Sequence, residues 1–319
     1  MLRLFLVTSI TVVSFLLLSC SKEDLPIENI PVKPEPILSI EYSKAVDTSG
    51  NFQKLDLDLY LPARKSFTDK APLFVMIHGG SFLRGTKEWM SENCVIMSDS
   101  GFVSVSINYR LGWRQTNACA GDTSNLKQAM YRGMQDAYAA IQFLVKHADE
   151  YGIDTSTIFI GGESAGACIA LNMACLNPTA SEYPFADCMQ SLGNIGQNSD
   201  QPLFPFAIRG ICNKWGAVAD TNSETRTFTV PVISFHGTDD PLVPIENGYL
   251  LGCKQTPAFG CEAMYKVMMY SQVPLEMYIK TWALHQPTGF DPAYTMSRTA
   301  AFFKKVMNGT ATQAVYIQK

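Results

Sequence analysis

The sequence predicts an α/β fold in which helices cover both faces of a mostly parallel central sheet. Short runs that are apolar throughout alternate along the chain with longer segments of helical periodicity, the order that builds such a sheet. Charged residues make up only 17% of the 319 residues, against a usual value of about 25%. Strands buried on both faces read as unbroken apolar runs, which accounts for this scarcity. The net charge of −4 comes without a basic block, so nucleic acid is not expected as a partner.

The N-terminal residues 1–20 have the pattern of a secretion signal. Arg3 precedes an apolar run that ends in Leu-Leu-Ser-Cys at Cys20. This ending resembles a bacterial lipobox, after which Cys20 becomes the lipidated N-terminus; the alternative is an ordinary signal peptide with a chance cysteine. The following Ser-Lys-Glu-Asp resembles an acidic tag that sends lipoproteins to the surface of some Gram-negative bacteria, although a solvated charge run would look the same. We therefore expect an outer-membrane or cell-surface lipoprotein, held to the membrane through Cys20.

The rest of the chain divides into a tether and one domain. Residues 21–37 contain four prolines and predict an extended spacer of about 50 Å. Residues 38–319 then form a single domain. Within it, residues 178–206 have no clear period and are expected to form a lid-like insertion.

The strands and helices of the domain follow from their hydrophobic patterns. Lys54–Tyr60 alternates leucine with aspartate, as a strand with one solvated face does. The longest helical segment carries one apolar stripe at spacings of three and four residues. The expected strands are Leu38–Tyr42, Lys54–Tyr60, Pro72–Ile77, Phe102–Asn108, Thr157–Ile160, Gly210–Asn213, Pro231–Phe235 and Leu275–Leu284. The expected helices are Lys87–Ser98, Leu126–Tyr151, Ala165–Leu176, Ile245–Leu251, Phe259–Ser271 and Pro292–Met307.

The cysteines fit an exported protein. Eight follow Cys20, an even number in an oxidising compartment. Cys253 and Cys261 are eight residues apart around a proline and a glycine and are the preferred local bridge, with two free thiols as the alternative. The chain has no Cys-x-x-Cys or His-Glu-x-x-His motif, so no metal and no cofactor is expected.

One motif has the form of a nucleophile elbow. Gly162-Glu-Ser164-Ala-Gly166 follows the predicted strand Thr157–Ile160 and leads directly into a predicted helix. The two glycines are needed for steric reasons, because a Cβ at either position would press on the adjacent strand or helix. The strand–turn–helix context favours Ser164 as a catalytic nucleophile over a chance match.

A second motif provides backbone donors. His78-Gly79-Gly80-Ser81-Phe82 follows a buried strand. The amides of Gly79 and Gly80, together with the N–H of Ala165, would form an oxyanion hole. A plain Gly-Gly turn is the alternative, and the sequence leaves open which amides point inward.

These two motifs resemble those of the esterase and carboxylesterase branch of the α/β-hydrolase fold. That branch carries His-Gly-Gly-Gly-Phe where this chain has His78–Phe82, Asn-Tyr-Arg-Leu at Asn108–Leu111 and Gly-Glu-Ser-Ala-Gly at Gly162–Gly166. The resemblance extends from about Leu55 to Met307. It departs at Ser81, where the family has its third glycine. A compact bacterial esterase is the closer likeness.

The acid and the base should follow Ser164 in that order. The segment His236–Pro244 looks like the family's acid turn, in which the carboxylate stands three residues before valine; this selects Asp240, with Asp239 as the alternative. The chain has four histidines. His78 belongs to the oxyanion turn, His147 lies late in a helix and His236 precedes the acid turn, which leaves His285 as the base.

The sequence therefore predicts a serine hydrolase of carboxylic esters with the triad Ser164, Asp240 and His285. The serine would form an acyl-enzyme that water releases. Location and resemblance favour acyl esters of extracellular glycans as substrates. A peptidase of the prolyl-oligopeptidase kind is an alternative, and the lack of a propeller domain before the hydrolase argues against it. A catalytically silent binding protein is another alternative, and the presence of all three triad residues argues against it.

Overall fold

The computed structural model describes residues 33–63, 69–113, 124–175, 177, 179, 183–196, 203–219, 228–253 and 256–319. The expected signal, Cys20 and most of the expected tether lie outside these residues. One compact unit, Pro31–Lys319, contains all of the described chain. Among the described residues, none of the helices combines the length and the apolar character that crossing a membrane requires.

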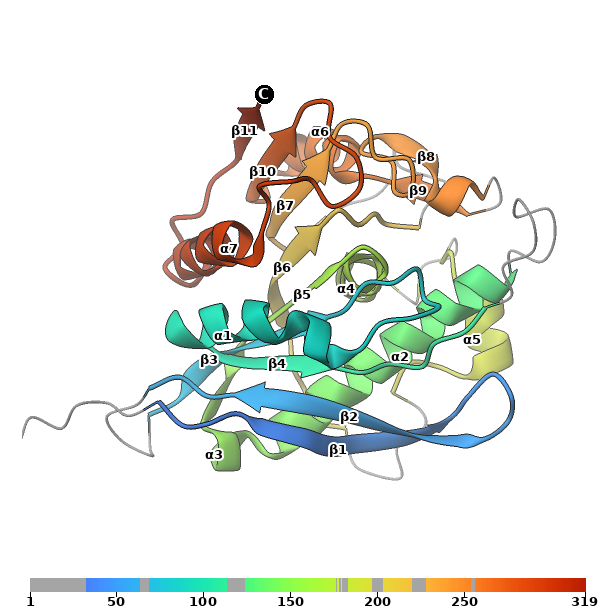
Figure 1. Cartoon of the computed structure of the whole chain (residues 1–319), viewed down its shortest axis with the longest axis vertical. Coiled ribbons are helices and arrows are strands. Elements are labelled where there is room, and N and C mark those ends of the chain that lie inside the picture. The colour runs from blue at the N-terminus through green and yellow to red at the C-terminus, as the bar shows by residue number, and fades with distance from the viewer. Residues whose placement is uncertain are drawn as a thin grey trace, which may run out of the picture. The chain divides into compact units, whose positions relative to one another are not determined.

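A central sheet organises the domain (Figure 1). Its strands lie in the order β1-β2-β4-β3-β5-β6-β7-β10-β11. β1 and β2 run antiparallel to their neighbours, and all other adjacent pairs are parallel. The predicted mostly parallel α/β sheet is therefore confirmed. The strands are β1 (Ile37–Val46), β2 (Phe52–Tyr60), β3 (Ala71–Ile77), β4 (Val103–Ile107), β5 (Ile153–Glu163), β6 (Ile208–Lys214), β7 (Val232–Gly237), β10 (Leu275–Lys280) and β11 (Ala314–Gln318).

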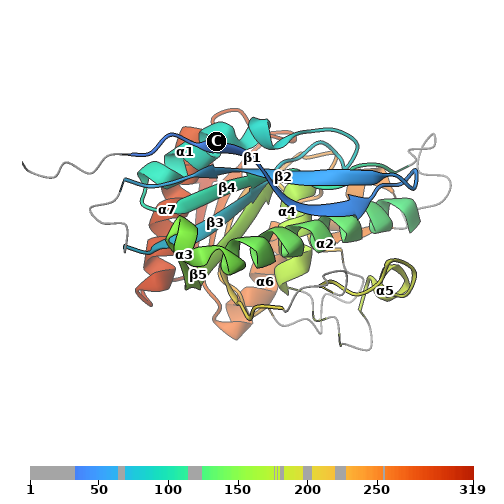
Figure 2. The same ribbon diagram turned by 90° about the horizontal axis from the view of Figure 1, so that it is seen from below.

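Helices cover both faces of this sheet (Figures 1 and 2). Strand β3 shows why its sequence is apolar throughout: Val75 faces one hydrophobic cluster and Phe74 faces the other. α1 (Ser91–Asp99) and α7 (Pro292–Met307) pack on the Phe74 side, and α2 (Ser124–Lys146), α4 (Ala165–Cys175) and α6 (Cys261–Ser271) pack on the Val75 side. Two short helices, α3 (Ala148–Tyr151) and α5 (Ala186–Leu192), complete the described α-helices, and a 3-10 helix at Lys87–Met90 precedes α1.

The expected helix at Ile245–Leu251 is wrong. The segment forms the short strand β8 (Asn247–Tyr249) and a 3-10 turn at Leu250–Gly252, and β8 pairs with β9 (Pro257–Phe259). Leu251 has a φ of 54°, which an α-helix does not allow. A Cβ on Gly248 would lie 2.8 Å from the Pro244 ring, so the strand runs close to the turn that precedes it.

Two other expectations need correction. The strand predicted to reach Leu284 ends at Lys280, and the chain adds an edge strand, β11, that its sequence did not suggest. The preferred bridge between Cys253 and Cys261 is also wrong, because Cys261 is a free, buried thiol at the start of α6. Within the expected insertion, the described α5 packs along α2, where Gln135 donates to the carbonyl oxygen of Leu192.

Candidate active site

Ser164 stands on a sharp turn between β5 and α4. Its φ is +53°, a left-handed conformation that costs energy for a serine. A Cβ on Gly162 would lie 2.3 Å from the carbonyl carbon of Gly166, and a Cβ on Gly166 would lie 2.1 Å from the carbonyl oxygen of Ile77. The two glycines thus allow the elbow to pack against itself and against β3, for the steric reason that the sequence motif suggested.

His285 connects the serine to a carboxylate. Its Nε2 lies 2.8 Å from Ser164 Oγ, and its Nδ1 lies 2.6 Å from Asp240 Oδ2. A carboxylate can only accept, so Nδ1 carries the proton and Nε2 is free to accept the serine hydroxyl proton. The structure thus brings together the three residues predicted as a triad, although His285 lies in the loop after β10 and not at the end of a strand.

The geometry separates Asp240 from its neighbour Asp239. The Asp240 side chain is fully buried, and its Oδ1 accepts the backbone N–H groups of Leu242 and Val243 at 2.9 Å each. Asp239 instead accepts the hydroxyl of Thr238 at the surface. Burial by itself raises the pKa of Asp240, but hydrogen bonds from His236 and His285 outweigh it and hold the pKa well below its ordinary value. The Asp240 carboxylate therefore stays ionised.

The loop that carries His285 is held by the acid turn. Asp239 N–H donates to the carbonyl oxygen of Ala283 at 2.9 Å, and Trp282 N–H donates to Thr238 Oγ1 at 2.8 Å. A Cβ on Gly237 would lie 2.3 Å from the same Ala283 oxygen. A glycine at the end of β7 therefore permits the close approach on which the position of His285 depends.

The predicted oxyanion turn lies against the nucleophile. A Cβ on Gly79 would stand 3.2 Å from Ser164 Cβ. Ala165 is the first residue of α4, where a backbone N–H has no acceptor within the helix. Gly80 has a φ of +109°, and Ser81 has a φ of +56°. Ser81 thus adopts a left-handed conformation that a glycine would adopt at lower cost than a serine.

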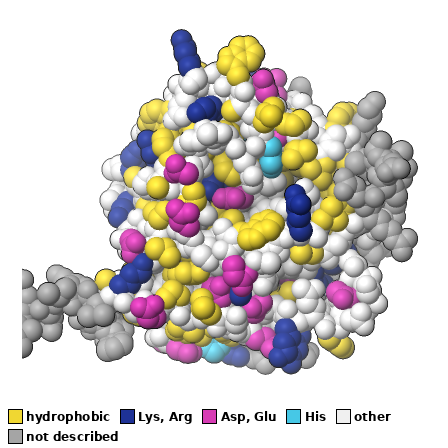
Figure 3. Space-filling view, viewed as in Figure 1, with side chains coloured by type: hydrophobic (Ala, Val, Ile, Leu, Met, Phe, Trp, Pro, Cys, Tyr) yellow, Lys and Arg dark blue, Asp and Glu magenta, His cyan; other side chains and the backbone are white. Residues whose placement is uncertain are grey.

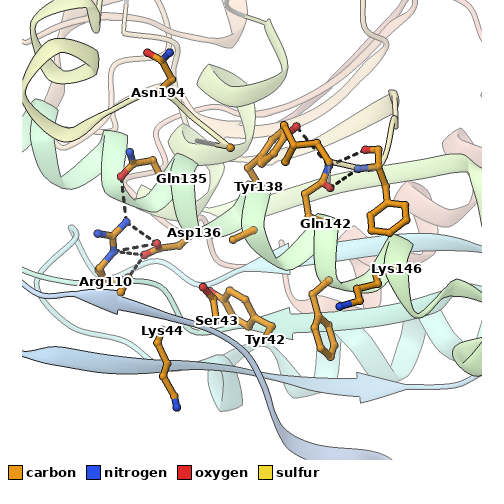
Figure 4. A pocket seen from close by; sticks show the side chains of 16 residues that line it. Tyr42, Ser43, Lys44, Arg110, Gln135, Asp136, Tyr138, Gln142, Lys146 and Asn194 are labelled. Atoms are coloured by element: carbon orange, nitrogen blue, oxygen red, sulfur yellow. Dashed lines mark hydrogen bonds and ion pairs between the residues drawn. The ribbon is translucent and has the colours of Figure 1, made fainter. Parts of the chain in front are cut away.

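The segment after β4 braces this turn. Trp113 donates its indole N–H to the Ser81 carbonyl oxygen at 2.8 Å, and Gly112 N–H donates to the carbonyl oxygen of Phe82 at 2.8 Å. Arg110 anchors the same segment to α2, since its Nε donates to Asp136 Oδ1 at 2.9 Å and a terminal nitrogen donates to that oxygen at 2.7 Å. Figure 4 shows this ion pair.

Lys214 is a residue that sequence reasoning missed. It ends β6, its carbonyl oxygen accepts Ser164 N–H at 2.9 Å, and its buried ammonium lies 2.5 Å from Glu163 Oε1 and 3.0 Å from Asn93 Oδ1. The elbow is therefore held by one residue through both its backbone and its side chain. A lysine at the end of a predicted central strand was the available signal, because a buried ammonium needs a carboxylate partner.

The cavity in Figure 4 is not the catalytic one. It measures about 280 Å³ and lies between β1, α2 and the residues Asn194, Gly196, Leu203 and Phe204, and its described lining includes none of the three triad residues. The described residues contain no cluster of three or more metal-ligating side chains suited to an ion. On the face shown in Figure 3, acidic and basic side chains are interspersed.

The positions of the triad residues define a protein of the α/β-hydrolase fold. The serine stands on the elbow after β5, the buried aspartate follows β7, and the histidine follows the neighbouring parallel strand β10. The order of the three residues along the chain, serine, acid and histidine, agrees with that class. The chain belongs to the BD-FAE family, whose model matches residues 57–224. The matched segment contains the oxyanion turn and Ser164; Asp240 and His285 lie beyond it.

Individual proteins agree with this assignment. The esterase LipI of Mycobacterium tuberculosis is 23% identical over 282 residues, which cover 84% of this chain and 79% of LipI. The propionate-bound thermophilic esterase of Thermogutta terrifontis superposes with a TM-score of 0.58 at 17% identity, over 86% of this chain and 94% of that one. A truncated carbohydrate esterase from gut microbiota gives a TM-score of 0.55 at 16% identity, over 89% and 99%. Both structural likenesses show the fold. The chain spans only 22% and 34% of two other curated relatives.

Proposed function

We propose that the protein hydrolyses carboxylic esters through an acyl-enzyme intermediate. The hydrogen-bonded series from Ser164 through His285 to Asp240 carries this proposal. His285 Nε2 accepts the proton as Ser164 Oγ attacks the ester carbonyl, then donates that proton to the departing alcohol. A water molecule, deprotonated in turn by His285, attacks the acyl-enzyme and releases the acid. Asp240 stabilises the imidazolium in both halves of the reaction.

The turn at Gly79–Gly80 and the first residue of α4 serve the same reaction. Attack on the carbonyl places negative charge on its oxygen. Backbone N–H groups of Gly79, Gly80 and Ala165, close to Ser164, would stabilise that charge. No metal or cofactor is needed for these steps.

The experiment compares wild type with Ser164→Ala and His285→Ala on short p-nitrophenyl esters. Loss of either residue should lower turnover by about 10⁶-fold, with circular dichroism unchanged. A fluorophosphonate probe should label wild type and fail to label Ser164→Ala. Near wild-type turnover in Ser164→Ala would refute the assignment, and a wild type that neither reacts with the probe nor hydrolyses any ester would favour a silent binding protein.

We infer that acyl esters of extracellular glycans are the substrates. Trp282, with 85% of its surface exposed, and Leu284, with 61%, precede His285 and offer an apolar surface beside it. Aromatic side chains of this kind stack on the apolar faces of sugar rings. The likeness to a carbohydrate esterase points the same way.

A panel of substrates tests the glycan inference. Acetylated and feruloylated xylan are compared with acetyl, butyryl and octanoyl p-nitrophenyl esters. Trp282→Ala should raise KM for the xylans and leave KM for p-nitrophenyl acetate unchanged, whereas preference for octanoyl esters over every glycan would reject the inference.

For the location, we propose a lipid anchor at Cys20, supported by the lipobox-like sequence that precedes it. Metabolic labelling with a fatty acid should be lost in Cys20→Ala. Labelling that survives this substitution would overturn the proposal.

A further inference from the structure

A second histidine lies against the acid of the triad. His236 is in β7, where it pairs with Ile279 of β10, and its side chain is fully buried. Its Nε2 lies 3.3 Å from Asp240 Oδ2 and 2.9 Å from the carbonyl oxygen of Val243. Asp240 Oδ2 is thus shared between two imidazoles, because the same oxygen accepts the proton of His285 Nδ1 at 2.6 Å.

The contacts of His236 fix where its proton lies. Both oxygen atoms near Nε2 are pure acceptors in an ionised site, so Nε2 must carry a hydrogen. Four donor groups therefore face the Asp240 oxygens. Two backbone N–H groups hydrogen-bond to Oδ1 and His285 Nδ1 hydrogen-bonds to Oδ2, while His236 Nε2, whose shorter contact is with the Val243 carbonyl oxygen, lies 3.3 Å from Oδ2.

The ionisable groups around the ring come from several elements. Asp240 faces it from the turn after β7, and the Cys261 thiol faces it from α6. Cys168 of α4 adds a second buried thiol near Asp240, and His285 lies on the far side of the carboxylate. Burial lowers the pKa of His236, but Cys261 and Asp240 outweigh this and raise it to about 10. The surroundings thus favour a proton on this ring.

We propose that His236 is a positioning residue that holds the Asp240 carboxylate through Nε2–H and withdraws negative charge from the oxygen that His285 uses. The proposal rests on the ester-hydrolase mechanism proposed above. A carboxylate that loses this donor concentrates its charge on the remaining contact with His285. It then holds the imidazolium more tightly, and it is also freer to rotate away from the alignment that proton transfer needs.

Three variants test this role. His236→Leu removes the donor at similar volume. His236→Gln keeps an N–H close to the original Nε2. Ser234→Ala is the matched control. Ser234 lies two residues earlier on the same face of β7, but its hydroxyl accepts a hydrogen bond from Asn213 and is not a partner of Asp240 in the hydrogen bonds described here.

We expect His236→Leu to lower kcat about 10–100-fold, with KM unchanged, and to move the acidic limb of the kcat/KM profile to higher pH by about half a unit or more. His236→Gln should restore most of kcat and bring the limb back towards wild type. Ser234→Ala should lower Tm without moving the limb. Proton NMR should show the downfield His285 Nδ1–H resonance shifted in His236→Leu and unchanged in Ser234→Ala.

The readouts separate the two proposals. Activity that persists in Ser164→Ala would defeat the proposed reaction, whereas the NMR resonance reports the His236 contact without any turnover. The role of His236 would be overturned if His236→Leu had the same acidic limb of the kcat/KM profile and the same His285 Nδ1–H resonance as wild type. A His236→Gln variant as impaired as His236→Leu would also overturn it, and this second variant decides the matter if the leucine protein does not fold.

Discussion

Trp113 donates its indole N–H to the carbonyl oxygen of Ser81 at 2.8 Å. The bond ties the segment after β4 to a residue whose φ of +56° is unfavourable for serine. Because Gly79 of the same turn lies against Ser164, loss of this hydrogen bond should lower kcat.

Trp113→Phe tests this connection. The change removes one neutral hydrogen bond of about 1 kcal/mol and keeps most of the aromatic surface. If the bond holds the turn in its catalytic position, kcat should fall about fivefold, the equivalent of that energy, with little change in Tm. Steady-state kinetics on p-nitrophenyl butyrate and a thermal melt provide the comparison. A kcat within experimental error of wild type would mean that the turn holds its shape without Trp113.

Adjacent aspartates provide a matched pair. Asp240→Asn removes the charge that stabilises the His285 imidazolium, so turnover should fall on the order of 10⁴-fold, as in serine proteases that lose this charge. Asp239→Asn should stay within about twofold of wild type, because that side chain contacts only Thr238 among the hydrogen bonds described here. Both variants are measured at several pH values. The reverse ranking would move the acid to Asp239.

Gly237 controls the position of the histidine loop. In Gly237→Ala the new Cβ would meet the Ala283 oxygen at 2.3 Å, so the loop must shift and take His285 with it. A displacement of about 1 Å costs on the order of 10²-fold in rate. Gly101→Ala, where φ is +99° and no atom lies within 4 Å of the new Cβ, controls for a general loss of stability. Equal rates in the two variants would contradict a specific effect on His285.

The fold could be predicted from the sequence because both faces of the sheet are buried. β3 has no polar side chain, and such an unbroken apolar run predicts a central strand. β11 lacks that signal, because it is a short edge strand with exposed residues. The segment Ile245–Leu251 reads as helical only if the effects of Gly248 and the preceding Pro244 on the backbone are ignored.

The triad was predictable for a different reason. Ser164 lies in a local motif, and His285 remained after the other histidines were assigned elsewhere. The roles of Lys214 and His236 depend on which side chains meet in space. His236 is four residues from Asp240, and its contact exists only because the turn at Asp240–Val243 folds back on the strand. The spacing of residues in the sequence does not predict that the turn at Asp240–Val243 folds back against β7.

The last prediction concerns stability and His78. Burial lowers the pKa of His78 to about 4, which the hydrogen bond to the Gly79 carbonyl oxygen only partly offsets, and its ring stacks on Tyr109 at 4.4 Å. Between pH 6.5 and pH 4 the unfolded chain therefore binds a proton that the folded protein does not. The free energy of unfolding should fall as pH falls through this window, by about 3 kcal/mol from this residue.

Urea unfolding at pH 7.5, 5.5 and 4 measures this effect in wild type and in His78→Gln. Glutamine cannot take up the proton, so the variant should be less stable at pH 7.5 and lose less stability on acidification. The carboxylates, including Asp240, titrate in both proteins, so their contributions cancel in the difference between the two free energies of unfolding. Parallel pH dependences in the two proteins would show that the pKa of His78 is the same in the folded and unfolded states, and the burial argument for this residue would then fail.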